Sequence, residues 1–509
     1  LVAGFALGLT PVVFIIAGLF FYMTASSYAE ATAMYPEAGG SSSFARHAFN
    51  EFWSFFAGWG QMLNYIITVA ISAYFMPHYL GAVLGFEALE KAPGDIIFGA
   101  VVIALLALVN VRGVKDSAAA NIVLATLDFA TQLLLVLLGI ALVLSPETLV
   151  DNISLGVAPT WRDFLIAIPI GMIAYTGIET ISNMAEEAVD ETRTIPQAIS
   201  RVRIAVFSIY FTLPFVALSA LPVTQQPDGS YQTLLGVGAE EGGYAGNPVL
   251  GIAKAMDLGP LQGFTEVYLG VLAATILFVA TNAGIIGVSR LVYSMGVHRQ
   301  MPDRLRQLHP RYGTPWIGIL LFGGIACLAL IPGQAAFLAN MYAFGAMLSF
   351  TIAHVAVITL RRTQPDRERP YRGPGTILGL PAFALIGGTG TALAFVVVTA
   401  LHLDVAVAGA SWLATGIVVY VVYRRRQGLD LTTTTRVAIP SPVTEGEAEY
   451  DSILLAFDGS RYYPDAVATA VRLAAQRRRG IHVLVTVTVP ASAPIDAPPP
   501  ELDFAARGI

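Results

Sequence analysis

The sequence predicts an all-α polytopic membrane protein that carries a partial α/β domain at its carboxyl end. Hydrophobic residues make up 55% of the 509 residues and charged residues only 13%, whereas a soluble domain carries about 25% charged residues. Apolar runs recur from residue 11 to residue 423, and a run of about 20 apolar residues crosses the hydrocarbon core of a bilayer. After residue 450 the pattern changes to short strands around one helix.

Residues 1–10 are too short to cross a bilayer. We expect them to be the remnant of a first transmembrane helix and its loop, so that the chain is truncated at its amino end. Eleven complete spans are predicted after this remnant, at residues 11–34, 52–79, 95–111, 118–144, 165–187, 197–222, 263–294, 316–332, 336–360, 377–401 and 405–423. The loop of residues 223–262 is expected to carry a short helix at Val249–Met256.

The distribution of positive charge predicts the orientation of the spans. One set of connecting segments carries only three basic residues, Lys91, Arg162 and Lys254. The other set carries nineteen: Arg46, Arg112, Lys115, Arg193, Arg201, Arg203, Arg290, Arg299, Arg304, Arg306, Arg311, Arg361, Arg362, Arg367, Arg369, Arg372, Arg424, Arg425 and Arg426. Cytoplasmic loops carry the excess of basic residues, so we expect a multi-pass protein of the cell membrane with a cytoplasmic carboxyl end.

The most unusual stretch of the membrane region is residues 169–196. Its apolar run is interrupted by Ala174–Gly177, and a carboxylate, Glu179, follows at once. A charge at the bilayer centre costs at least about 2.5–3.5 kcal/mol, so it normally faces a cavity, a partner or a pathway. An interrupted helix is tolerated only where its freed backbone is buried or lines water. The stretch therefore predicts a broken helix that forms half of a ligand site. The alternative is a kinked helix with a satisfied internal glutamate.

This stretch resembles the sixth transmembrane helix of the amino acid–polyamine–organocation (APC) superfamily of permeases. The family pattern is an aromatic residue, any residue, Gly, Ile or Phe and an acid, then a Glu pair, then Arg-Thr-Ile-Pro. The matching residues are Tyr175, Gly177, Ile178 and Glu179, then Glu186-Glu187, then Arg193 to Pro196. Two further stretches agree with the family, namely Pro36 to Gly40, and Ser289-Arg290 with Met301-Pro302. The resemblance covers about residues 1–426.

The resemblance implies a LeuT-like 5+5 inverted-repeat fold, with the binding site where the broken first helices of the two repeats meet. Residues 11–426 would form this permease domain, and the first broken helix would lie upstream of Leu1. The implied function is secondary active transport of an amino acid by alternating access, with proton symport preferred over sodium. An amino acid exchanger (antiporter) and a transport-dead membrane nutrient sensor are the alternatives. No enzymatic activity is implied.

Residues of the break and one residue of the third helix are expected to bind the substrate: Ile173, Ala174, Tyr175, Thr176, Gly177 and Asn64. The amino end of a half-helix attracts a carboxylate, and freed carbonyl groups attract an ammonium group or a cation. Tyr175 is the candidate gate, and its alternative is an ordinary packing tyrosine. Asn64 either lines the pathway or joins helices.

Two intramembrane carboxylates, Glu179 and Asp128, are the candidates for proton or cation coupling. The alternative for Glu179 is a structural hydrogen bond that pins the broken helix. The alternative for Asp128 is a polar contact between helices. Some members of the family carry a lysine near the position of Asp128, and its absence here puts a lysine-type mechanism in doubt. Thr281 and Asn282 are a possible cation site, with helix packing as the alternative.

No metal, cofactor or nucleic-acid partner is expected. The single cysteine, Cys327, cannot form a disulfide within the chain, and the seven histidines show no ligand spacing. The expected partners are an amino acid substrate, a coupling ion and the lipid bilayer.

Residues 427–450 are predicted to be a linker, because they include four consecutive threonines, two prolines and several acidic residues. Beyond the linker, Ile453–Phe457 is predicted as a strand, Asp465–Arg479 as a helix and Ile481–Val489 as a second strand. Such a β-α-β unit is typical of the opening of a parallel α/β sheet.

The segment of residues 451–509 resembles the start of a universal stress protein domain, whose first strand ends in Asp and is followed by Gly-Ser, here Asp458 to Ser460. Members of that family bind ATP through a late glycine-rich loop. The chain ends before any such loop, so nucleotide binding by this truncated domain is unsupported. Its expected role is to regulate the transporter from the cytoplasm.

Overall fold

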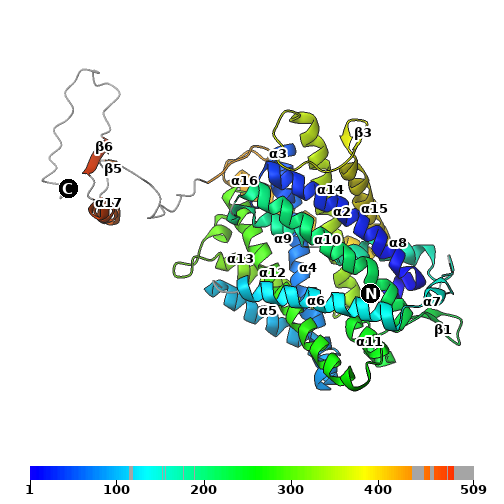
Figure 1. The fold of residues 1–509 in the computed structure, drawn as a ribbon. Helices are drawn as coiled ribbons and strands as arrows, with labels where there is room; N and C mark the ends of the chain where they lie inside the picture. Colours follow the sequence, from blue (N-terminus) through cyan, green and yellow to red (C-terminus); the bar gives the residue numbers. More distant parts are fainter. Residues whose placement is uncertain are drawn as a thin grey trace, which may run out of the picture. The chain divides into compact units, whose positions relative to one another are not determined.

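The computed structural model describes residues 1–113, 118–151, 153–154, 156–175, 177–188, 190–437, 452–458, 464–477 and 480–486. The chain divides into two compact units, Leu1–Val437 and Ala438–Ile509. The first unit is a bundle of helices (Figure 1). The second unit contains a small β-α-β motif and is described by itself.

The first unit is built from sixteen α-helices within its described residues. In the first half they are α1 (Val2–Ala6), α2 (Thr10–Met34), α3 (Ser41–Ala48), α4 (Glu51–Leu84), α5 (Gly94–Arg112), α6 (Ala118–Leu142), α7 (Pro146–Asp151), α8 (Trp161–Ile173) and α9 (Ile178–Asn183). In the second half they are α10 (Glu191–Ala220), α11 (Pro248–Ala255), α12 (Gln262–Val297), α13 (Trp316–Ala329), α14 (Ala335–Thr363), α15 (Ala382–Leu401) and α16 (Leu403–Arg426).

Two short antiparallel hairpins lie in the connections of the bundle. The first joins β1 (Thr224–Gln225) to β2 (Tyr231–Gln232), and the second joins β3 (Thr376–Ile377) to β4 (Leu380–Pro381). The first hairpin belongs to the long loop between α10 and α12. The same loop contains α11, so the short helix expected near its end is present.

Ten helical segments in the described part of the chain are long and apolar enough to cross a membrane, with α1 and α2 counted as one segment and α8 and α9 as another. The prediction of eleven complete spans is therefore too high by one. The predicted span at residues 316–332 is the 14-residue helix α13, which is only about 21 Å long at 1.5 Å per residue. It begins after Pro315 and ends at Ala329, and Pro332 disfavours helical backbone at Ile331 and so prevents a longer helix.

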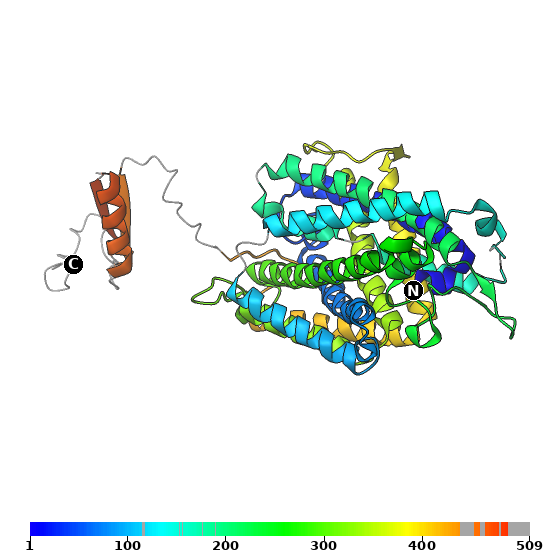
Figure 2. The same ribbon diagram turned by 60° about the horizontal axis from the view of Figure 1, so that its bottom comes forward.

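Helix α4 is the centre of the bundle. It contacts α3, α5, α12, α13, α14 and α16. Its most extensive contact is with the long helix α12, which is green in Figure 2. On the other side, α2 packs against α8, α10 and α15, and α6 covers α10 (Figure 1). The residues of α4 and α14 are mostly buried, whereas few residues of α6 and α16 are buried. The exposed helices are apolar, which suits a surface that faces lipid.

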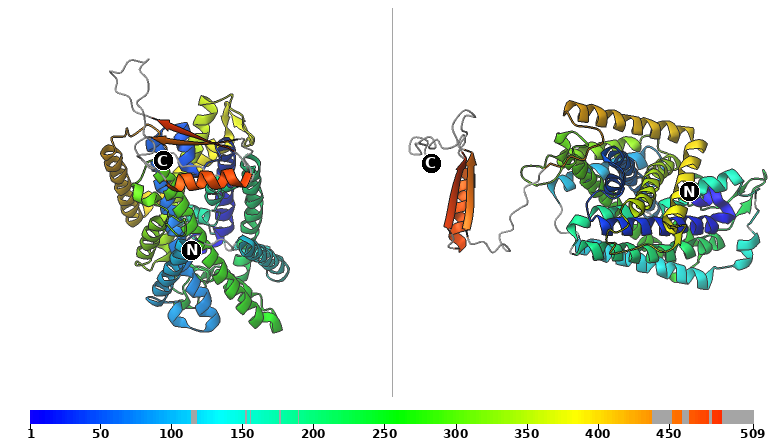
Figure 3. Two further views of the ribbon diagram at one scale, coloured as in Figure 1. Left: turned by 90° about the vertical axis from the view of Figure 1, so that its left-hand side faces the viewer. Right: turned by 90° about the horizontal axis from the view of Figure 1, so that it is seen from above.

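Helix α16 lies at the outside of the bundle, where it is the gold helix along the upper edge in the right-hand panel of Figure 3. Two indoles fasten it to α4. Trp59 Nε1 donates to the backbone oxygen of Trp412 at 2.8 Å, and Trp412 Nε1 donates to that of Trp59 at 3.0 Å. The centroids of the two indole rings lie 4.6 Å apart in a stacked arrangement. Tyr420 of α16 stacks on Phe55 of α4 in the same way, with ring centroids 4.4 Å apart.

In the second unit, β5 (Ser452–Asp458) and β6 (Gly480–Thr486) form a parallel pair joined through α17 (Pro464–Arg477). The predicted strand, helix and strand are therefore present. The remaining residues of the predicted stress-protein-like segment lie outside the described residues.

Candidate functional site

The interrupted span predicted at residues 174–177 is present. Helix α8 ends at Ile173, and the amides of Ala174 and Tyr175 donate to the carbonyl groups of Gly171 and Met172 at 3.3 and 3.1 Å, three residues back. Helix α9 begins at Ile178, after Gly177 with a φ of +108°. Residues other than glycine rarely adopt that conformation, so the glycine allows the break. Thr176, which was predicted to bind substrate, lies outside the described residues.

Glu179 joins the break to helix α4. Its Oε2 accepts a hydrogen bond from the backbone N–H of Gly177 at 3.1 Å, and its Oε1 accepts one from Asn64 Nδ2 at 3.0 Å. Both side chains are buried, with exposed fractions of 3% for Glu179 and 1% for Asn64. The structure therefore brings together Asn64, Gly177 and Glu179, which were predicted separately for substrate binding and coupling. A buried carboxylate held by two N–H donors is well satisfied.

A second layer of polar side chains continues from the break along α9 and α4. Asn183 Nδ2 donates to the hydroxyl of Tyr65 at 2.6 Å, and Asn183 Oδ1 accepts from the N–H of Gly39 at 3.0 Å. Gln61 Nε2 donates to the same Tyr65 hydroxyl at 3.5 Å. Neither Asn183 nor Gln61 was expected at the site from the sequence. Their spacing would have found them, because Asn183 is four residues after Glu179 and Gln61 three before Asn64, on the same helix faces.

Tyr175 is fully buried and packs between α2 and α10. Its hydroxyl donates to the backbone oxygen of Phe14 at 2.8 Å, and its ring lies 5.4 Å from that of Phe21 and 5.2 Å from that of Tyr210. A Cβ atom at Gly18 would come within 2.8 Å of the Tyr175 hydroxyl. This glycine therefore makes room for the tyrosine, whose contacts are those expected of the packing alternative, and the role of Tyr175 as a gate stays a prediction.

Asp128, the second predicted coupling group, lies on α6 and accepts from Gln132 Nε2 at 2.7 Å within the same helix. The ring of Tyr210, on α10, contacts that of Tyr175 beside the break. No pattern in the sequence indicated Tyr210, because it is one of many aromatic residues in the spans.

The possible cation-site residues bond to neighbouring backbone and to another helix. Thr281 Oγ1 donates to the carbonyl of Leu277 at 2.8 Å, one turn earlier on α12. Asn282 Oδ1 accepts from Asn110 Nδ2 at 2.6 Å and so ties α12 to α5. These contacts are those expected of the helix-joining alternative, and the cation site stays a prediction.

The break combines a satisfied carboxylate with unused polar capacity. Among the described residues, Asn64 Oδ1 is buried without a hydrogen-bond partner. A Cβ atom at Gly177 would meet no described atom within 4 Å, so open space adjoins the backbone there. Within the described residues no group of three His, Cys, Asp or Glu side chains is arranged to hold a metal ion. This chemistry suits a small polar molecule held by backbone groups, an amide and a carboxylate.

Comparisons with known proteins agree with this geometry. The profile of the amino acid permease family matches residues 2–423. The methylthioribose transporter of Bacillus subtilis is 26% identical over 438 residues, which cover 82% of this chain and 86% of the transporter. The branched-chain amino acid permease BcaP of the same organism is 26% identical over 437 residues, with coverages of 82% and 86%. The low-affinity putrescine importer PlaP of Escherichia coli is 27% identical over 395 residues, with coverages of 75% and 80%.

The family match confirms the resemblance to APC permeases that the sequence motifs indicated. Since these relatives are transporters and the bundle has ten segments able to cross a membrane, the chain is a multi-pass membrane transporter and not an enzyme. It belongs to the amino acid permease family.

Proposed function

We propose that the protein is a secondary active transporter of an amino acid or a related small amine, driven by proton symport through alternating access. The observation that carries the proposal is the break between α8 and α9, where buried Glu179 accepts hydrogen bonds from Gly177 and Asn64. Interrupted spans with a carboxylate at the break suit substrate and ion binding near the middle of a membrane.

The hydrogen bonds of Glu179 suggest how a proton and a substrate are linked. An ionised carboxylate only accepts hydrogen bonds, whereas a protonated one also donates through its O–H. Protonation of Glu179 would therefore weaken its hold on the N–H of Gly177 or on Asn64. The released backbone N–H would become available to a substrate carboxylate, so that proton and substrate bind together. In the empty, ionised state the same N–H is occupied.

The names of the relatives bear on the substrate class. They include a branched-chain amino acid permease and a putrescine importer, and both kinds of substrate carry an ammonium group. A buried carboxylate beside freed backbone would attract such a group. We therefore propose an amino acid with an apolar side chain as the first substrate to test, with a diamine as the second.

The fold and orientation of the bundle and the role of the second unit form part of the same proposal. The bundle would be a LeuT-like inverted-repeat fold, and the arginine-rich connections, with the carboxyl end, would face the cytoplasm. The second unit would then be a cytoplasmic regulator. Thr281 and Asn282 remain a predicted cation site.

Uptake by the purified full chain in proteoliposomes tests the proposal. An imposed inward proton gradient should accumulate labelled leucine, or labelled putrescine, in vesicles that contain no internal substrate. An exchanger would accumulate labelled substrate only in vesicles that were preloaded with unlabelled substrate. A sensor would bind the label without accumulating it under either condition. Either result would contradict proton symport.

A further inference from the structure

The segment that follows α16 does not leave the bundle at once. Residues 427–437, here called the strap, run back across the ends of α4 and α12. The N–H of Glu51 in the first turn of α4 donates to the carbonyl of Thr432 at 3.1 Å, and the N–H of Val437 donates to the carbonyl of Val297 at the end of α12 at 2.9 Å. The strap therefore bridges two helices that are far apart in the sequence.

The side chain of Arg424 fastens the strap. It is fully buried, and its Nε donates to the carbonyl of Asp430 at 2.9 Å while its Nη2 donates to that of Thr433 at 2.5 Å. The hydroxyl of Tyr420 donates to the carbonyl of Leu431 at 2.6 Å. A guanidinium has five N–H donors in a fixed fork, so one buried arginine can organise several carbonyl groups of an otherwise irregular segment.

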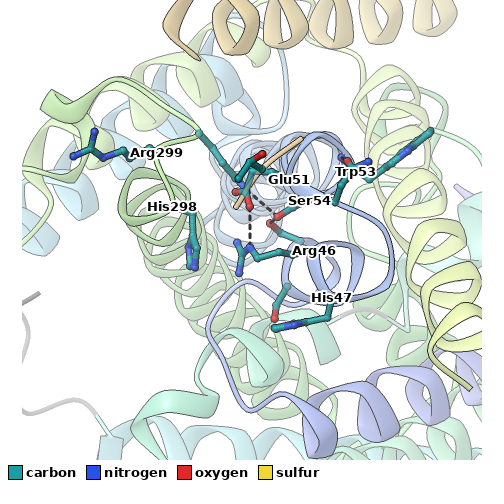
Figure 4. A network of polar contacts seen from close by, with 12 residues as sticks. Arg46, His47, Glu51, Trp53, Ser54, His298 and Arg299 are labelled. Atoms are coloured by element: carbon teal, nitrogen blue, oxygen red, sulfur yellow. Dashed lines mark hydrogen bonds and ion pairs between the residues drawn. The ribbon is translucent and has the colours of Figure 1, made fainter. Parts of the chain in front are cut away.

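A buried polar cluster lies at the helix ends that the strap bridges. It consists of Arg46 on α3, Glu51 and Ser54 on α4, and Gln300 just after α12, and is here called the Glu51 cluster. Gln300 Nε2 donates to Glu51 Oε1 at 2.5 Å and to Ser54 Oγ at 2.8 Å. Arg46 points toward Glu51 (Figure 4), with its Nε 3.5 Å from Glu51 Oε2.

The Glu51 cluster is not fully satisfied by its own hydrogen bonds. Within the part of the chain that the structure describes, Arg46 Nη2 and Gln300 Oε1 are buried without a hydrogen-bond partner, and Arg46 Nε and Glu51 Oε2 face each other as an ion pair at 3.5 Å without a hydrogen bond. Buried polar atoms without partners are costly, and water would satisfy them if the cluster opened. The strap contributes hydrogen bonds that favour the closed arrangement and would be lost on opening.

The cluster connects to the broken span through the turn between α2 and α3. Arg46 Nη1 donates to Glu37 Oε2 at 3.3 Å. Two residues further on, the N–H of Gly39 donates to Asn183 Oδ1 on α9 at 3.0 Å. The same turn is therefore held on one side by the cluster and on the other by the second half of the broken span.

We propose that the strap is a latch that holds this end of the bundle closed. While Arg424 fastens the strap, the α2–α3 turn stays packed against α9, and release of the strap opens this end to water. The latch would regulate transport only if the proposed function is correct. Because the chain continues from the strap into the unit of residues 438–509, that unit is attached to the far end of the latch.

Thiol labelling of the purified full chain tests the latch without any substrate. The reporter is Ser41→Cys in a Cys327→Ser background, because Ser41 is fully buried in the first turn of α3 beside Gly39. Arg424→Gln should make labelling of this thiol by a water-soluble maleimide at least several-fold faster. Arg425→Gln is the matched control, since Arg425 is exposed on the same helix and its variant should label at the unaltered rate.

Hydrogen–deuterium exchange in the same samples reports whether the strap is released. Faster exchange in residues 429–437 and in the first turn of α4, with unchanged labelling of Ser41→Cys, would overturn the latch. If Arg424→Gln does not fold, Tyr420→Phe removes only the hydrogen bond to Leu431 and should give a smaller acceleration of both readouts; no change in labelling despite faster strap exchange would likewise overturn the proposal. Failure of leucine or putrescine uptake would count against the proposed function alone, because neither readout needs transport.

Discussion

Asn64 Nδ2 on α4 and Glu179 Oε1 on α9 lie 3.0 Å apart, and this hydrogen bond joins the central helix of the bundle to the second half of its broken span. The carboxylate also accepts from the N–H of Gly177, inside the break. One side chain thus connects the central helix of the bundle to the backbone at the break. A change in the protonation of Glu179 would therefore alter its hydrogen bonds both to Asn64 and to the N–H of Gly177.

Replacing Asn64 with Ala should destabilise the protein, because one buried carboxylate oxygen loses its donor. The expected cost is about 1–3 kcal/mol, measured as a lower midpoint of thermal unfolding in detergent. Thr265→Ala is a suitable control, since the hydrogen bond of that threonine to the carbonyl of Leu261 is exposed; it should change the midpoint little. Equal changes of the unfolding midpoint in the two variants would show that the Asn64–Glu179 hydrogen bond contributes no more to stability than the bond of Thr265.

Gly177→Ala tests whether the break depends on a glycine conformation. An alanine Cβ would meet no described atom within 4 Å, so the cost arises from the backbone with φ at +108° and should be about 1–2 kcal/mol. Gly324→Ala is the matched control, because it also points into open space but lies within α13. That substitution should stabilise the helix by roughly 0.5–1 kcal/mol. Opposite shifts of the unfolding midpoint are expected, and shifts of the same sign would contradict this account of Gly177.

Gly177→Leu tests the site itself. The larger side chain should fill the open space beside the break and abolish binding of labelled substrate in a detergent-solubilised binding assay. Wild-type affinity in this variant would remove Gly177 from the binding site.

A buried ion pair at the ends of α2 and α14 should contribute strongly to stability. Glu30 is fully buried and accepts from Arg361 Nε and Nη2 at 2.7 and 2.6 Å and from the N–H of Gly373 at 2.8 Å. Glu30→Gln leaves a mostly buried arginine without its carboxylate, which should cost about 3–5 kcal/mol. Glu87→Gln removes an exposed pair with Lys91 and should cost no more than about 1 kcal/mol. Thermal unfolding of both variants measures the two losses of stability. Similar losses would be inconsistent with burial as the cause of the larger effect.

His298, just beyond α12, predicts a pH dependence of stability. Burial, with a contribution from the charge of Arg46 and a smaller one from Arg436, lowers the pKa of His298 to about 4, although the carbonyl of Ser294 and the charge of Glu37 oppose the shift. The unfolded chain therefore binds a proton at higher pH than the folded protein. Stability should fall as the pH decreases from about 6.5 to about 4, by on the order of 3 kcal/mol from this group.

The unfolding midpoint between pH 7.5 and pH 5, followed by tryptophan fluorescence, measures this dependence. His298→Gln keeps an N–H donor for the Ser294 carbonyl but does not titrate, so its midpoint should fall less over the same range. Parallel pH profiles for the two proteins would assign the dependence to other groups.

The position of the break was predictable because its cause is local. A glycine and a carboxylate inside an apolar run conflict with a continuous lipid-facing helix, and Gly177 and Glu179 show that conflict in the sequence itself. The strand, helix and strand of residues 452–486 were predictable for a similar reason, since the period of apolar residues changes with the type of element. The short length of α13 was missed because apolar composition alone does not reveal where a helix stops.

Partners across helices were not predictable. Whether Asn282 faces a cation or Asn110 depends on how α12 and α5 pack, and the orientation of Tyr175 depends on the space left by Gly18. The segment of residues 427–450 was predicted to be a linker from its threonines and prolines, yet residues 427–437 belong to the first unit. Their order depends on the donors of Arg424, a contact that composition does not show.

Proton-driven uptake by Glu179→Gln in proteoliposomes tests the central claim most directly, with Glu186→Gln as the matched control because Glu186 is exposed and lies seven residues further along. The glutamine side chain still accepts a hydrogen bond from Gly177 or Asn64, but it cannot take up or release a proton near neutral pH. Glu179→Gln should therefore exchange labelled for unlabelled substrate across the membrane while losing accumulation driven by a proton gradient, and Glu186→Gln should retain both. Accumulation by Glu179→Gln with an unchanged response to the proton gradient would contradict the account.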